Sequence, residues 1–144
     1  MASSYTTRLR VEKQTNGENS GTWNTIYSAV FEMLEEAIAG YVAVATTGGS
    51  TTLSANNNLT DQSRPMIIKA TGTLVSNATF TIPAGSKIYV IWNATSGAFT
   101  LTVKTSGGTG VTVTQGNKAI IFCDGTDCYQ AFDGDFFIQQ LANG

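Results

Sequence analysis

Carboxylates are the most numerous groups in this sequence that could support catalysis, because the chain contains ten Asp and Glu residues but no His. Without an imidazole, Ser–His and Cys–His nucleophilic mechanisms and His-containing metal sites are excluded. The grouped carboxylates are Glu32, Glu35 and Glu36 near the end of a predicted helix, and Asp124, Asp127, Asp133 and Asp135 in D-G-T-D and D-G-D segments. We expect the first group to be solvated or to contact Lys or Arg of a neighbour. The second lacks the ligand spacing of a calcium loop and is expected to form turns. We therefore predict no enzymatic activity, no metal and no cofactor.

Cys123 and Cys128 bracket a tight turn with the sequence Asp-Gly-Thr-Asp, for which two registers are open. If Gly125 and Thr126 form a two-residue loop, the cysteines face each other with Cα atoms roughly 4.5–5.5 Å apart, within reach of a disulfide. If Asp124 and Gly125 instead form a type I′ turn, Cys123 pairs with Thr126 and no bridge forms. Two buried free thiols are favoured in a chain made in a reducing cytoplasm.

An amphipathic helix is predicted from about Trp23 to Ala39, because apolar residues recur there at offsets of three, four and seven. Thr22 suits the N-cap position, and Gly40 suits the left-handed position that ends a helix. We expect the apolar stripe to be the interface between copies of the chain. The residues predicted for this interface are Trp23, Ile26, Tyr27, Val30, Met33, Leu34 and Ala37.

Residues 1–21 are predicted to be an extended arm, because they are mostly polar and have no periodicity. Such a segment buries too little apolar surface to offset its ordering entropy, so we expect it to order only against a partner. The contacts to that partner are predicted to come from alternating basic and apolar residues, which are Arg8, Leu9, Arg10, Val11 and Lys13. With the helix, this arm makes up an anchoring region over residues 1–40.

Residues 41–144 are predicted to form a β-rich head, because short apolar or alternating runs are separated by turn signals every 8–12 residues. The run 78–82 alternates with period two, and 87–93 is nearly continuous in apolar residues, so that Trp92 is expected in the core. The fold class predicted is mainly β, with an N-terminal arm and one helix followed by an antiparallel sandwich or jelly roll. An apolar tail from Phe132 to Leu141 is expected to dock on a neighbour.

Composition excludes two kinds of partner. Only 12% of the residues are charged and the net charge is −2, so the chain lacks the basic surface of a nucleic-acid-binding protein. No apolar run approaches the ~18–20 residues that cross a bilayer, and the N-terminus lacks the apolar stretch of a secretory signal. We therefore expect neither nucleic acid nor membrane as a partner.

Two stretches of the sequence resemble small fibre and virion-surface proteins of tailed bacteriophages. One is the opening R-L-R-V-E-K-Q-T-N-G-E-N-S-G-T-W-N with the helix that ends E-E-A-I-A-G. The other is P-A-G-S-K-I-Y-V-I-W-N-A-T-S-G-A-F-T-L-T-V-K-T-S-G-G-T-G-V-T-V-T-Q-G with I-F-C-D-G-T, which is similar to the β-domains of the same group. The first match is the more specific, and together they cover most of the chain.

The resemblance implies a structural virion protein, an oligomer that is often a trimer, anchored by its N-terminus to other virion proteins. Such a protein would be assembled in the bacterial cytoplasm and displayed on the virion surface. A short tail fibre is the first interpretation. The alternatives are a capsid decoration or head fibre, and a module that binds a host surface glycan. A hydrolase of surface polysaccharide is the least favoured, because the chain offers few catalytic groups.

Overall fold

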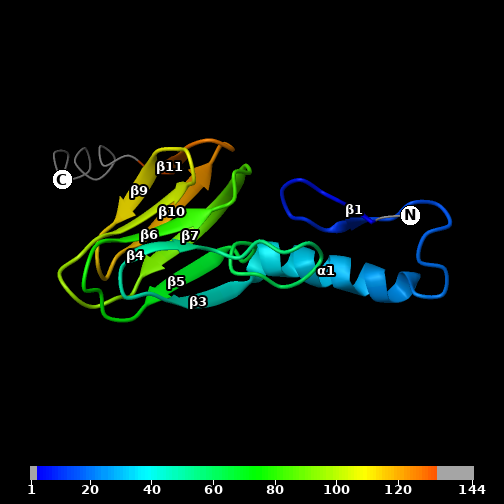
Figure 1. Cartoon of the computed structure of the whole chain (residues 1–144), viewed down its shortest axis with the longest axis horizontal. Helices are drawn as coiled ribbons and strands as arrows, with labels where there is room; N and C mark the ends of the chain where they lie inside the picture. The colour runs from blue at the N-terminus through cyan, green and yellow to red at the C-terminus, as the bar shows by residue number, and fades with distance from the viewer. Residues whose placement is uncertain (1–2, 133–144) are drawn as a thin grey trace, which may run out of the picture.

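One α-helix separates a small N-terminal hairpin from a head of two β-sheets in the computed structural model of the chain, which describes residues 3–132 (Figure 1). The mainly β class with one helix is confirmed for these residues. The predicted C-terminal docking tail and the turn carboxylates Asp133 and Asp135 lie outside them. The helix α1 covers Trp23–Ala39, and the strands are Ser4–Tyr5 (β1), Glu12–Lys13 (β2), Tyr41–Ala45 (β3), Gly49–Thr52 (β4), Ile67–Thr71 (β5), Ala78–Ile82 (β6), Lys87–Asn93 (β7), Leu101–Thr105 (β8), Gly110–Val113 (β9), Lys118–Cys123 (β10) and Cys128–Gln130 (β11).

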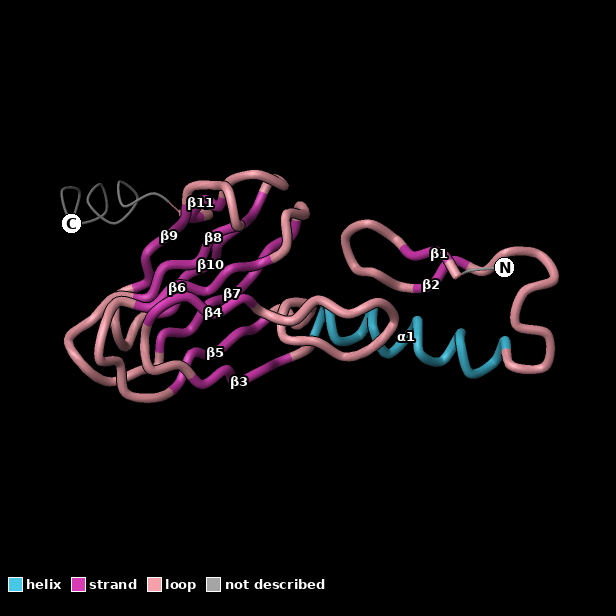
Figure 2. The backbone as a smooth tube through the Cα atoms, in the orientation of Figure 1, coloured by secondary structure: helices cyan, strands magenta, loops and turns pink. Residues whose placement is uncertain are grey.

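The head is built by a chain that winds between two sheets. A five-stranded sheet has the order β11-β10-β7-β5-β3, and a four-stranded sheet has the order β4-β6-β8-β9. From β3 to β8, consecutive strands alternate between the sheets, so that each pair of strands makes one turn of a coil (Figure 2). The last three strands reverse direction and complete both sheets.

The predicted antiparallel arrangement is wrong for four strand pairs of the head. The pairs β3/β5, β5/β7, β4/β6 and β6/β8 are parallel, while β8/β9, β7/β10 and β10/β11 are antiparallel. Successive turns of the coil stack with a constant offset of 23 residues, since Ile67 opposes Val90 and Ala78 opposes Leu101. Alternating apolar residues indicate that one face of a strand is buried, and this holds for either pairing direction.

The corners of the coil stack on one another through backbone hydrogen bonds. The Ser96 amide donates to the Gly72 carbonyl at 2.9 Å, and the Leu74 amide donates to the Ser96 carbonyl at 2.8 Å. Gly72 has φ of +111°, and a Cβ there would collide with the carbonyl oxygen of Thr46 in the preceding turn. The sharp corner and the close stacking therefore both require glycine at this position.

The core lies between the two sheets and is filled from every strand that faces inward. Strands β6 and β8 alternate strictly between buried and half-buried residues, as their sequences predict. The completely buried apolar side chains are Ile68, Phe80, Ile91, Leu101, Val103 and Ile121. Burial of each contributes about 1.5–3 kcal/mol relative to exposure, so these positions hold the two sheets together.

The helix passes into the head without a loop. Gly40 has φ of −72° and ψ of 151°, so it is extended and not left-handed as predicted, and β3 begins at the next residue. Its amide donates to the Glu36 carbonyl at 2.8 Å, and a Cβ at Gly40 would collide with the Glu36 backbone. Thr22 occupies the N-cap position, but its hydroxyl makes no capping hydrogen bond. No helix in residues 3–132 is long and apolar enough to cross a membrane.

Replacing Gly72 by alanine tests the stacked corner. The expected result is a loss of about 1–3 kcal/mol in the free energy of unfolding, because the residue must keep a left-handed φ and meets the Thr46 carbonyl. Gly107→Ala is the matched control, since a Cβ there meets no atom within 4 Å and its φ is not left-handed. Urea unfolding of both variants measures the effect, and equal stabilities would contradict the stacked geometry.

Candidate functional site

The guanidinium of Arg64 is completely buried where the arm, the helix and the β4–β5 loop (residues 53–66) meet. Its Nε donates to the Leu9 carbonyl of the arm at 3.0 Å, and Nη2 donates to the Asn56 carbonyl at 2.7 Å. Nη1 donates to the Leu59 carbonyl and lies 3.3 Å from Glu36 Oε2 of α1. One side chain therefore connects all three segments.

Asp61 is the second buried charge of this junction. Its carboxylate accepts hydrogen bonds from the Arg10 guanidinium at 2.7 Å and from the amides of Asn56, Ser63 and Arg64 at 2.9, 3.0 and 2.6 Å. Burial alone would raise the pKa of Asp61, but the hydrogen bonds and the positive charges of Arg10 and Arg64 lower it below its usual 3.8. Asp61 is therefore ionised in the folded protein at neutral pH.

The arm is folded against its own chain, which the sequence did not predict. Strands β1 and β2 pair as a short antiparallel ladder beside α1 (Figure 1). The Asn58 amide donates to the Arg10 carbonyl at 2.8 Å, and the Asn58 side chain accepts from the Glu12 amide at 3.3 Å. The β4–β5 loop thus supplies the partner that an arm of this composition needs in order to be ordered.

The five residues predicted to anchor the chain point to two different surroundings. Val11 is buried, Arg10 forms the ion pair with the loop, and the carbonyl of Leu9 accepts from Arg64. Arg8 and Lys13 are exposed, and Arg8 donates a 2.6 Å hydrogen bond to a serine hydroxyl of the head. Only Arg8 and Lys13 present their charges to a partner outside the chain.

The helix carries two adjacent apolar stripes. The inner stripe has the spacing four, three, four, and its members are half-buried or buried; it consists of Ile26, Val30, Met33 and Ala37. Met33 Sδ lies 2.9 Å from Arg64 Nη1, so this stripe faces the junction. Met33 and Ala37, which the sequence assigned to an interface between copies, are buried within the chain itself.

The outer stripe is displaced by one residue and faces outward. It has the same four, three, four spacing and consists of Tyr27, Phe31, Leu34 and Ile38, with Trp23 one turn before it. Phe31 and Ile38 are 65% and 69% exposed, although neither was assigned to the predicted interface. The rings of Trp23 and Tyr27 meet edge to face at 6.1 Å, and Tyr27 and Phe31 are 6.4 Å apart. These aromatic side chains have no partner from the described residues other than each other.

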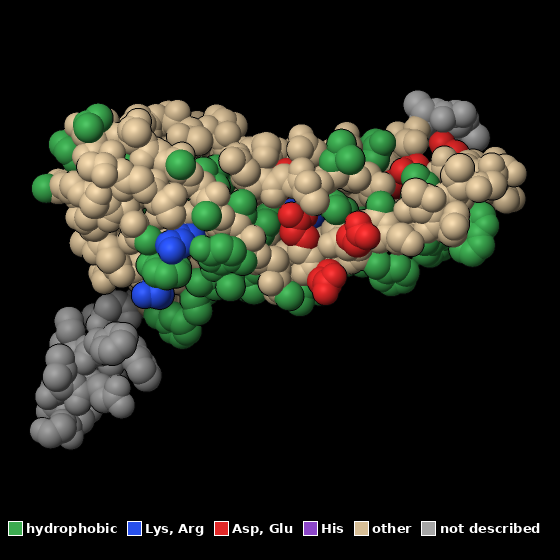
Figure 3. Space-filling view, turned by 90° about the horizontal axis from the view of Figure 1, so that it is seen from below, with side chains coloured by type: hydrophobic (Ala, Val, Ile, Leu, Met, Phe, Trp, Pro, Cys, Tyr) green, Lys and Arg blue, Asp and Glu red, His purple; other side chains and the backbone are tan. Residues whose placement is uncertain are grey.

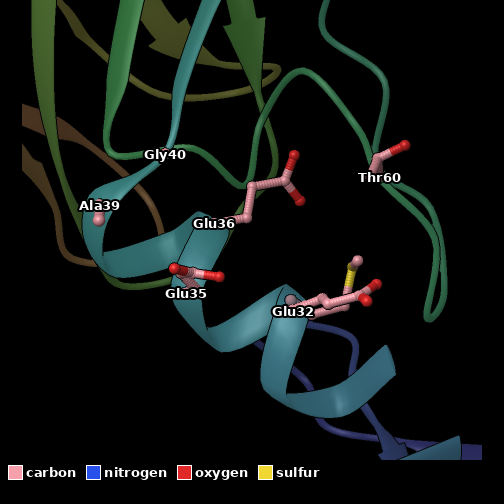
Figure 4. A pocket seen from close by; sticks show the side chains of 7 residues that line it. Glu32, Glu35, Glu36, Ala39, Gly40 and Thr60 are labelled. Carbon is pink, nitrogen blue, oxygen red and sulfur yellow. The ribbon is translucent and has the colours of Figure 1, made fainter. Parts of the chain in front are cut away.

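The helix glutamates line a shallow hollow of about 350 Å³ between α1 and the β4–β5 loop (Figure 4). Glu36 reaches toward the loop and pairs with Arg64, whereas Glu32 and Glu35 are exposed. Thr60 lies across the hollow on the loop. Within residues 3–132, no group of three or more His, Cys, Asp or Glu side chains is arranged to hold a metal ion.

The cysteines adopt the first of the two predicted registers. Cys123 opposes Cys128, because the Asp124 amide donates to the Asp127 carbonyl at 3.1 Å and leaves a two-residue loop between them. Both are buried free thiols, and burial together with the neighbouring Cys123 raises the pKa of Cys128 to about 12. The Asp124 carboxylate accepts from the Thr126 and Asp127 amides at 2.8 and 2.9 Å, which is the predicted role in a turn.

Trp92 is not in the core, as the apolar run suggested, but on the outer face of the five-stranded sheet. It opposes Lys69 on β5 and Lys118 on β10. The two ammonium groups lie 4.1 and 4.9 Å from the indole centroid, in cation–π contact. The lysines therefore occupy the space over the indole that a stacked sugar ring would need.

Comparison with known proteins leaves the geometry as the basis for interpretation, since no protein-family model, curated protein or solved structure matches the chain. The features that sequence reasoning missed are Arg64 and Asp61. The available signal was weak: two charges three residues apart, in a polar loop, within a chain that has few charges.

Arg64→Met tests whether the junction depends on the buried guanidinium. We expect a loss of about 3–5 kcal/mol in the free energy of unfolding, because Asp61 keeps its charge while the carbonyls of Leu9, Asn56 and Leu59 lose their donor. Trypsin should also cleave the arm faster. Arg8→Met is the control and should change stability by less than about 0.5 kcal/mol, since Arg8 is exposed. A similar effect of both variants would contradict the role of Arg64.

The lowered pKa of Asp61 predicts a pH dependence. A carboxyl whose pKa is depressed by folding contributes its full stability above its unfolded pKa, here 3.8, and loses it as the pH falls through the folded pKa. The difference in unfolding free energy between the unmodified chain and Asp61→Asn should be constant from pH 5 to 7 and should shrink below about pH 4. A difference that is independent of pH down to 3 would contradict this assignment.

Proposed function

We propose that the chain is a structural subunit of a bacteriophage virion, an oligomeric surface protein such as a short tail fibre. In this proposal the N-terminal part attaches to other virion proteins and the β-sheet head is displayed. The observation that carries it is the outer stripe of α1, which exposes three aromatic rings and Ile38 on a helix that projects from one end of the head (Figure 1). Large apolar side chains gathered on one face mark a surface that is covered by another protein.

The spacing of the outer stripe favours association with another helix of the same kind. Steps of four, three and four residues place side chains along one line of a helix, as in knobs-into-holes packing. The helix has 17 residues and is therefore roughly 26 Å long, which is short for an independent coiled coil. The heads would have to contribute to the same association, and a homotrimer is the expected state.

The folded arm supports attachment through a preformed surface. The hairpin lies beside α1, and its exposed basic groups Arg8 and Lys13 are available to an acidic partner. Because Arg10 and Asp61 already hold the hairpin, binding would not require ordering of a flexible segment. The resemblance to tailed-phage proteins suggests that this partner is another virion protein.

A tail fibre and a capsid decoration would use the same anchor and head, so the position on the particle distinguishes them. Labelling the head and locating the label in electron micrographs of the particle separates tail from capsid. Absence of the label from purified particles would contradict the virion proposal. Sedimentation of the full chain as a stable monomer at micromolar concentration would contradict the oligomer.

Arg8→Glu and Lys13→Glu, made separately, test the attachment surface. Each should lower incorporation into particles at least about tenfold, because reversing a charge in a complementary interface costs more than the 1.4 kcal/mol that corresponds to this factor. The mass of the free oligomer should stay the same. Lys104→Glu on the four-stranded sheet is the matched charge reversal and should be incorporated normally. Normal incorporation of both arm variants would refute the role of the arm.

A further inference from the structure

The two sheets of the head present opposite chemistry to the outside. The outer face of the four-stranded sheet is lined by threonines, and the hydroxyls of Thr102 and Thr112 lie 3.0 Å apart across β8 and β9. On the outer face of the five-stranded sheet, large apolar side chains take the equivalent outward positions. Those that are at least 40% exposed are Tyr41, Ile88, Ile120, Phe122 and Tyr129. Only the second face resembles a surface that is buried in an assembly.

These apolar side chains form rows across the five strands. Ile120 opposes Val90, which opposes Ile67, which in turn opposes Tyr41 on the edge strand β3. In the next row Phe122 lies between Ile88 and Tyr129, and the rings of Phe122 and Tyr129 stack at 5.3 Å. The rows make one continuous apolar patch, which we call the sheet patch.

The sheet patch is continuous with the outer stripe of the helix. Tyr41 follows the last residue of α1 by two positions, so its row lies at the end of the sheet that adjoins the helix. The row containing Trp92, Lys69 and Lys118 lies farther from the helix. Figure 3 shows apolar side chains gathered over this end of the head, with basic side chains on the side away from the helix. An apolar centre with charged groups at its margin is the anatomy of a protein interface.

We propose that the sheet patch is covered by a second copy of this chain. The inference rests on the oligomer proposed above and identifies the surface through which its heads associate. Because α1 runs directly into β3, copies that join along their outer stripes also bring their heads side by side. The threonine-lined sheets then remain on the outside of the assembly.

The exposed area is sufficient for such an interface. The stripe and the sheet patch together carry nine large apolar side chains with exposures between 40% and 69%. Since a large aromatic side chain has roughly 150–250 Å² of surface, these residues leave on the order of 800 Å² uncovered. One partner of a stable protein interface contributes about that area.

Trp92 provides a reporter for the sheet patch alone. The chain has two tryptophans, so Trp23→Phe leaves Trp92 as the single source of indole fluorescence. In this background, acrylamide should quench Trp92 several-fold less in the oligomer than in a variant that also carries Ile120→Glu. Ile120→Glu should weaken association at least tenfold in sedimentation equilibrium. Thr81→Glu, on the outer face of the four-stranded sheet, is the control and should change neither measurement.

The outcomes separate this inference from the proposed function. An oligomer in which Trp92 is quenched as strongly as in the Ile120→Glu variant would overturn the sheet interface and leave the helix-mediated oligomer standing. A monomeric unmodified chain would overturn both. The C-terminal segment of the same chain is the other conceivable cover, and Phe136→Ser with Phe137→Ser tests it in the full-length protein. If that double variant exposes Trp92 without changing the oligomer mass, the second copy is not the occupant.

Discussion

The buried guanidinium of Arg64 is the interaction on which the N-terminal half of the structure depends. A charge in the interior is tolerated only when each of its donors has a partner, and here the partners come from the arm, the helix and the β4–β5 loop. Moving any one of these segments would leave the guanidinium incompletely paired. Asp61 adds the opposite charge and binds Arg10, so the arm is held by a network of charges and not by apolar burial alone.

This constraint determines which side of the helix remains available. The junction takes the inner stripe, with Met33 and Ala37 buried against the chain's own segments, and thereby turns the outer stripe away from the protein. The direct passage from Ala39 through Gly40 into β3 then aligns that stripe with one outer face of the head. The proposed oligomer and the proposed sheet interface follow from the same orientation, because helix and sheet expose their apolar side chains on a continuous surface.

The coil of the head produces two outer faces that differ in role. Each turn places one strand in each sheet, so every sheet collects residues from equivalent positions of successive turns. Threonines gather on one outer face, while Ile, Phe, Tyr and Trp gather on the other. Threonine hydroxyls interact well with water and with each other, as Thr102 and Thr112 do, which suits a displayed surface. The apolar face has no such means of solvation.

The sequence by itself determined the features that depend on neighbouring residues. Apolar periodicity predicts α1 and the strands β6 and β8, and the short Asp-Gly-Thr-Asp turn limits Cys123 and Cys128 to two registers. These signals are local, because a helix turn, a strand or a hairpin is set within about ten residues.

Only the tertiary structure decided what each buried face packs against. Periodicity shows that a side is covered but does not identify the partner, so parallel stacking at an offset of 23 residues was mistaken for antiparallel pairing. For the same reason Trp92 was expected inside the head, and Met33 between copies of the chain. Arg64 and Asp61 contact residues from Leu9 to Glu36, far from them in the sequence. Such contacts form only when distant segments meet, and a single polar loop carries no local pattern that reveals them.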